Sequence, residues 1–97
     1  MSAPHAILHQ ADGHRGAFRI ELEGKSVAAM TYTVAGARLI IIDHTEVDES
    51  LRGTGAGQAL VEAAVQWARV NGKRIMPLCP FARSVFDRTP EFGDVRR

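Results

Sequence analysis

The sequence Arg52-Gly53-Thr54-Gly55-Ala56-Gly57 stands between a long apolar segment and an amphipathic one, and it organises the rest of the chain. The residues after it repeat apolar side chains at helical spacing: Leu60, Ala64, Trp67 and Ala68. This spacing predicts a helix over Gln58–Val70, and Asn71-Gly72 is typical of its end. Glycines before a helix leave backbone N–H groups uncovered at the positive end of the helix dipole, which favours an anion. The alternative is a close-packed turn that binds nothing.

Two apolar segments flank this helix and predict strands over Arg38–Val47 and Arg74–Cys79. A strand, a helix and a second strand in this order form a β-α-β unit, in which the strands lie parallel with a right-handed crossover. The run Leu39–Ile42 is apolar on both strand faces, so we expect it to be central and covered on both sides. Pro80 is typical of a helix start and predicts a second helix over Phe81–Arg88.

The N-terminal half shows the alternation of half-buried strands. Phe18–Leu22 alternates apolar with charged residues, and Val27–Val34 is rich in β-branched residues; together they predict a hairpin. A weaker pattern over His5–Gln10 predicts a short edge strand, followed by a turn at Asp12–Gly16. We therefore predict one domain over residues 1–97 of the α/β (α+β) class. It would have a mixed, mostly antiparallel sheet with one parallel β-α-β unit and helices packed on it.

Composition excludes several classes of function. Twelve basic and eleven acidic residues give a net charge of +1 at pH 7, too small a surplus for a protein that grips nucleic acid. The single cysteine, Cys79, allows neither an intramolecular disulfide nor a cysteine-rich zinc site, and we expect no bound metal. Met1–Gln10 is unlike a secretory signal, and the apolar run Leu39–Ile42 is far shorter than the ~20 residues of a membrane helix. We expect a cytoplasmic protein without membrane contact.

The spacing of the glycines narrows the choice of anion. A P-loop needs Gly-Lys-Ser/Thr, and no lysine lies between Lys25 and Lys73. The dinucleotide fingerprint needs Gly-x-Gly-x-x-Gly with an acidic residue about 20 positions later, whereas this loop reads Gly-x-Gly-x-Gly and Lys73 stands there. The loop therefore matches neither nucleotide-binding motif, because the required lysine, glycine spacing and acidic residue are missing.

The pattern Arg52-x-x-Gly55-x-Gly57 resembles the loop with which the GNAT superfamily of N-acetyltransferases binds the pyrophosphate of acetyl-coenzyme A. The order of strand, loop, helix, strand and helix is also similar, and the whole chain resembles a minimal single-domain branch of that superfamily. Further segments carry the resemblance: His44-Thr45-Glu46-Val47, Leu51–Gly57, Pro77-Leu78-Cys79-Pro80-Phe81 and Thr89-Pro90-Glu91-Phe92.

The resemblance implies an acetyl-CoA-dependent N-acetyltransferase that moves an acetyl group to an amine of a small molecule, a protein lysine or a protein N-terminus. It also implies a monomer or weak dimer with the GNAT-like fold. The residues it places on the cosubstrate come from the strand end and the loop: Glu46, Val47, Arg52, Gly53, Thr54, Gly55, Ala56 and Gly57.

Chemistry of this kind needs a base for the attacking ammonium and an acid for the departing thiolate. His44 and Cys79 end the two predicted parallel strands, so we expect them to face one cavity, His44 as base and Cys79 as acid or nucleophile. Glu46 is a third candidate base. The alternatives are a Cys79 that is only a small buried side chain and a His44 that only bonds a turn. Many members use a tyrosine of the last helix as acid, but this helix carries Phe81 and Phe86 instead.

Two other functions stay open. One is a CoA-binding or partner-binding module with little catalysis, and the other is an acyl carrier acting through Cys79. The remaining histidines have no acidic partner at metal-binding spacing and are predicted at the surface: His5, His9 and His14.

Overall fold

The structure is a computed structural model and describes residues 6–97. Five strands form one sheet in the order β1-β2-β3-β4-β5. Their bounds are β1 Ile7–Asp12, β2 Arg15–Leu22, β3 Lys25–Val34, β4 Leu39–Val47 and β5 Arg74–Pro77. Neighbouring strands are antiparallel from β1 to β4, and β5 is parallel to β4. The predicted mixed, mostly antiparallel sheet with one parallel β-α-β unit is confirmed.

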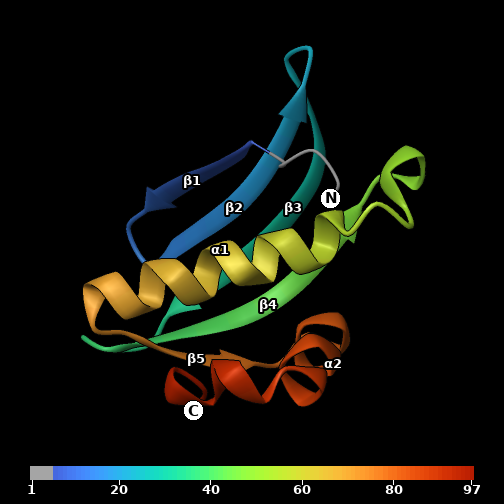
Figure 1. The fold of residues 1–97 in the computed structure, drawn as a ribbon. Coiled ribbons are helices and arrows are strands. Elements are labelled where there is room, and N and C mark those ends of the chain that lie inside the picture. Colours follow the sequence, from blue (N-terminus) through green and yellow to red (C-terminus); the bar gives the residue numbers. More distant parts are fainter. Residues whose placement is uncertain (1–5) are drawn as a thin grey trace.

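Two helices and two short 3-10 turns complete the described part of the chain. Helix α1 spans Ala56–Asn71 between β4 and β5, and α2 spans Pro80–Arg88. The turns are η1, Glu49–Leu51, and η2, Pro90–Asp94. Figure 1 shows α1 lying across the sheet and α2 beside β5. Helix α1 begins two residues before its predicted start because Gly55, in the left-handed conformation, already serves as its N-cap.

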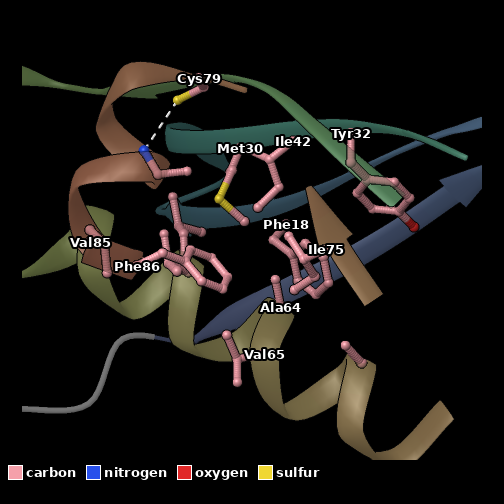
Figure 2. Packing of buried hydrophobic residues seen from close by; sticks show 14 of the residues in the cluster. Phe18, Met30, Tyr32, Ile42, Ala64, Val65, Ile75, Cys79, Val85 and Phe86 are labelled. Carbon is pink, nitrogen blue, oxygen red and sulfur yellow. Dashed lines mark hydrogen bonds between the residues drawn. The ribbon is translucent and has the colours of Figure 1, made fainter. Parts of the chain in front are cut away.

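One hydrophobic core joins the sheet to both helices (Figure 2). Helix α1 contributes Leu60, Val61, Ala64, Val65 and Ala68, which repeat on one side of the helix. Helix α2 adds Ala82, Val85 and Phe86. The sheet residues opposite them alternate along the strands: Phe18, Ile20, Ala28, Met30, Tyr32, Ile40, Ile42 and Ile75.

The expectation that β4 is covered on both sides is wrong. Ile40 and Ile42 are buried, but Leu39 and Ile41, which point to the other face, are only half-buried. The two helices touch each other, with the Phe81 ring lying against Gly57, so the sheet does not separate them. The apolar residues of the second face are shielded by their strand neighbours and by no helix of residues 6–97.

Both ends of the sheet differ from the prediction in detail. His5 lies outside the described residues, and the edge strand runs two residues beyond Gln10, which narrows the predicted turn to Gly13-His14. Strand β5 ends at Pro77 rather than Cys79, because the N–H groups of Leu78 and Cys79 both donate to the carbonyl of Ile42 and Cys79 then becomes the N-cap of α2.

His9 has a structural role that its sequence pattern did not predict. Its ring stacks on Phe18 with centroids 4.2 Å apart, and its Nε2 lies 2.6 Å from the hydroxyl oxygen of Tyr32. Trp67 of α1 approaches the same ring edge-on at 5.1 Å. The strand-edge histidine therefore closes the end of the core beside α1, although part of it stays exposed.

Candidate functional site

The site begins where β4 and β5 part. Pairing between them ends at Ile42 and Pro77, after which β4 continues to Val47 with a strand partner on the β3 side alone. The register with β3 also shifts here, because Ile42 pairs with Tyr32 and His44 pairs with Thr31, the residue before Tyr32. Asp43 is thus an extra residue in β4, a β-bulge. The bulge exchanges the faces to which the following side chains of β4 point. It lies where β4 no longer pairs with β5, so one edge of the strand is unpaired there.

A cavity of about 370 Å³ opens at this point. It is of the size that holds a small ligand. Its walls come from the end of β4, the glycine loop, the first turn of α1 and α2: Thr45, Val47, Leu51, Arg52, Gly53, Gly55, Ala56, Gly57, Gln58, Phe81 and Arg88.

The glycine loop exposes backbone N–H groups to this cavity. Gly53 and Gly55 have φ angles of +80° and +83°, a region that side-chain-bearing residues rarely adopt. Gly55 is the N-cap of α1 and offers no side chain, so no capping oxygen occupies the first N–H groups of the helix. The helix dipole adds positive potential at the same place. The loop therefore presents unoccupied donors to a ligand.

Gly57 shapes the cavity in a different way. A Cβ built on it would lie 2.5 Å from Cζ of Phe81, so the ring of α2 rests directly on the helix backbone. Phe81 is 38% exposed and forms the apolar wall opposite the loop. The absence of a side chain at Gly57 thus sets how closely the two helices approach.

The charge of the cavity is positive. Arg52 and Arg88 line it, and none of the lining residues is acidic. The nearby Asp48 is held by the turn η1: it accepts hydrogen bonds from the side chain and the backbone of Ser50, which lower its pKa. The backbone N–H of Arg52 closes that turn on the carbonyl of Glu49 at 3.1 Å. The cavity therefore suits an anionic ligand.

The structure does not bring His44 and Cys79 together. Cys79 is 4% exposed, and its Sγ lies 3.2 Å from Oγ1 of Thr45 and accepts from the N–H of Ala82 at 3.4 Å (Figure 2 draws the second contact). The His44 side chain is 65% exposed, with Nε2 3.6 Å from the Glu46 carboxylate. Adjacent strand residues point to opposite faces, so Thr45 faces Cys79 and the cavity while His44 faces away.

The expectation that His44 and Cys79 face one cavity is therefore wrong, because neither lines it. The catalytic roles of the two residues stay predictions. The Cys79 thiol contacts the Thr45 hydroxyl, and Thr45 lines the cavity. His44 lies on the other side of β4, beside Glu46.

Most of the residues predicted to hold a cosubstrate lie in the cavity wall. Glu46 and Thr54 do not: Glu46 lines a separate shallow hollow near Ser26, and the Thr54 hydroxyl donates back to the carbonyl of Leu51. Sequence reasoning missed five lining residues: Thr45, Leu51, Gln58, Phe81 and Arg88. A signal existed for two of them, since Phe81 and Arg88 are seven residues apart and thus share one side of a helix.

Among residues 6–97, no three His, Cys, Asp or Glu side chains gather closely enough to hold a metal ion. In the same part of the chain, no helix has the length and apolar character needed to cross a membrane.

The family described as GCN5-related N-acetyl-transferase matches residues 17–95. Protein NATD1 of Gallus gallus is 32% identical over 74 residues, 68% of this chain and 67% of that protein. A GCN5-like protein of Staphylococcus aureus, solved by NMR, is 31% identical with a TM-score of 0.74, covering 98% of this chain and 90% of its own. An aminoglycoside 6'-N-acetyltransferase complexed with coenzyme A shares the fold at 18% identity and a TM-score of 0.57, covering 66% and 37%.

The fold and the loop thus define a GNAT-type α/β domain, as the sequence predicted. The chain belongs to the GCN5-related N-acetyltransferase family. Membership supports N-acetyltransferase activity in general terms.

Proposed function

We propose that this protein binds acetyl-CoA in the cavity between the glycine loop and α2 and transfers the acetyl group to an amine. One observation carries the proposal: the uncapped N-terminus of α1, reached through Gly53 and Gly55 in left-handed conformations, opens with Arg52 onto a cavity without acidic residues. Backbone donors, a helix dipole and a guanidinium together match a pyrophosphate. A coenzyme A complex of a protein with this fold gives general support.

The parting of β4 and β5 supplies the place for the reaction. The unpaired edge of β4 beyond Ile42 leaves backbone groups free to bind the pantetheine arm, and Val47 borders that edge in the cavity wall. Glu46 would contribute through its backbone, because its side chain points elsewhere. A thioester held here is accessible from the opposite side of the strand, where no helix of the described residues covers the sheet.

In the proposed reaction the amine nitrogen attacks the thioester carbonyl, a C–N bond forms, and the C–S bond breaks with its electron pair on sulfur. We assign His44, exposed beside Glu46 on the uncovered face, as the base that takes the proton of the attacking ammonium. Cys79 acts as the acid through Thr45, whose hydroxyl lies 3.2 Å from the thiol and borders the cavity. Holding the amine and the thioester in the correct relative position supplies the remaining rate acceleration.

Titration calorimetry with CoA and an assay of thiol release with a panel of amines test the proposal. The wild type should bind CoA and release thiol in an amine-dependent way. Arg52→Ala should weaken CoA binding, and the loss should shrink as ionic strength rises, because part of the attraction is screened charge. Unchanged binding at low salt would remove Arg52 from the site.

The second candidate is a CoA-binding module with little catalysis. The separation of His44 from Cys79 across β4 favours it, because no ready-made acid–base pair meets in the cavity. CoA binding without turnover of any amine is the outcome that selects it. An acyl carrier through Cys79 is less well supported, because a thiol that is 4% exposed and caps a helix is a poor acceptor. A stable acetyl adduct on Cys79 would select that function.

A further inference from the structure

Arg88 is the second arginine in the wall of the cavity, in addition to Arg52. It lies in the last turn of α2 and lines the same cavity as Arg52, from the opposite wall. Its Nε donates to the carbonyl of Ser84 at 3.2 Å, and this hydrogen bond orients the guanidinium group. Among residues 6–97, its Nη groups have no hydrogen-bond partner, and its neighbour Asp87 is already paired with Arg96 at 2.9 Å. Both Nη groups of Arg88 are therefore available to a ligand.

The two arginines reach the cavity from different elements, Arg52 from the glycine loop and Arg88 from the last turn of α2. Helix α2 touches the glycine loop through Phe81, whose ring lies against Gly57. Arg88 is seven residues further along the same side of α2, about 10 Å at 1.5 Å per residue. It therefore lies toward the end of α2 away from Cys79 and from the point where β4 and β5 part. A ligand whose pyrophosphate occupies the loop would meet Arg88 with a more peripheral group.

We propose that Arg88 binds the 3'-phosphate on the ribose of CoA and makes the protein selective for cosubstrates that carry it. The inference rests on the proposed function. CoA bears two anionic groups of different kinds, a pyrophosphate within the chain and a phosphomonoester on the ribose. A phosphomonoester carries roughly −1.5 to −2 charges at neutral pH and accepts paired N–H donors from arginine. The loop and Arg52 bind the first group, and Arg88 binds the second.

The experiment compares CoA with dephospho-CoA, which lacks only the 3'-phosphate, by titration calorimetry at low salt. The wild type should bind CoA at least ~10-fold more tightly than dephospho-CoA. Arg88→Gln should reduce CoA affinity about 10-fold and leave dephospho-CoA affinity unchanged, because a tenfold change is the scale of one charge-assisted contact. Arg88→Lys should restore part of the preference, since it keeps the charge but not the paired donors.

A matched control is Arg83→Gln, which removes the same charge from the same helix at an exposed position outside the cavity. It should bind both ligands as the wild type does. Arg52→Gln should weaken both ligands alike, because both carry the pyrophosphate. Melting temperatures of all variants identify any loss of folding, which would affect both ligands and not their ratio.

The outcomes separate the two proposals. If Arg88→Gln weakens both ligands equally, or neither, while the wild type binds CoA, the assignment of Arg88 is wrong and the proposed function stands. If the wild type binds neither ligand, the proposed function itself is overturned and the assignment falls with it. Loss of the CoA preference in Arg88→Gln, with dephospho-CoA binding intact, supports both.

Discussion

Gly55 and Gly57 belong to one loop, yet each is required for a different physical reason. Gly55 has open space around the position of a Cβ, and its constraint is the backbone, at φ +83°. Gly57 has an ordinary helical backbone, and its constraint is the Phe81 ring. A substitution at the first position strains the chain, whereas one at the second changes the cavity. Residues that look alike in a motif can therefore be tested separately.

Gly55→Ala should destabilise the protein by about 1–2 kcal/mol, the cost of placing a residue with a Cβ in the left-handed region. It should also weaken CoA binding about 10-fold, because relief of the strain turns the first N–H groups of α1 away from the cavity. Chemical denaturation measures the first effect and calorimetry the second. Gly13→Ala, which strains a turn at φ +63° far from the cavity in sequence, is the control and should leave CoA affinity unchanged.

Gly57→Ala should cost less stability, because the exposed Phe81 ring can swing away from the new methyl group. The ring would then move within the cavity wall, so CoA affinity should fall even though the fold is kept. Adding Phe81→Leu should recover part of that affinity, since the shorter side chain leaves room for the methyl group. Equal affinity in the single variant and the wild type would show that the close approach of α2 does not shape the binding site.

Cys79 combines a structural contact with its proposed chemical role, and two variants separate them. Cys79→Ala removes the acceptor for the N–H of Ala82 and should cost about 0.5–2 kcal/mol, the usual value of an N-cap. Cys79→Ser keeps both that contact and the bond to Thr45, so it should fold well. If Cys79 supplies the proton to the departing thiolate, both variants should lose turnover about 10²-fold with CoA binding intact. Normal turnover in the serine variant would leave Cys79 a structural residue.

At the scale of elements, the decisive feature is β4, which pairs with β5 over its first half and leaves it over its second. The sequence predicted the strand, its bounds to within one residue and its change to polar residues after Ile42. It did not reveal the extra residue at Asp43, because a bulge depends on the register with β3 and leaves no local pattern. That single residue decides that Thr45, and not His44, faces the cavity.

His9 packs strand β1 against the core, and its contribution to the free energy of unfolding should depend on pH. Burial against Phe18 and Trp67 lowers the pKa of His9, so the folded protein favours the neutral ring. Below the ordinary pKa of about 6.5 the unfolded chain binds the proton more readily. The free energy of unfolding should therefore rise with pH through that range. His9→Gln should flatten this dependence in denaturation curves between pH 5 and 8, whereas His14→Gln, in the exposed turn, should keep it.

At the scale of the whole molecule, the strands, helices and their order followed from the sequence, because periodicity and glycines are local signals. The one-sided covering of the sheet did not. Apolar residues at Leu39 and Ile41 are typical of a strand that is buried on both faces. In this sheet, however, no helix of the described residues covers their face, and the neighbouring strands leave them half-buried. The far wall of the cavity was missed for a similar reason: Phe81 and Arg88 line the cavity from α2, and the packing of α2 against α1 that brings them there leaves no local sequence signal.

Ligand binding should stabilise this small domain measurably. A ligand that binds only the folded state at 100 times its Kd adds about 2.7 kcal/mol, and in a domain of this size each kcal/mol raises Tm by roughly 4–8 °C. Saturating CoA should therefore raise Tm by about 10 °C or more in a thermal-shift scan. Gly55→Ala at the same CoA concentration should show a smaller shift. No shift in the wild type would contradict binding at the cavity.

The unpaired end of β4 has a consequence for the order of events in catalysis. In the proposed reaction, acetyl-CoA brings its thioester to that edge from the side of α1 and α2, and the amine reaches the thioester from the uncovered side of the sheet. Neither substrate has to leave before the other binds. Cys79 is buried, so it is poorly placed to form a covalent acetyl-enzyme intermediate between the two binding events. Both should thus be bound together when the acetyl group moves. Initial-rate plots against the two substrates should then intersect rather than run parallel.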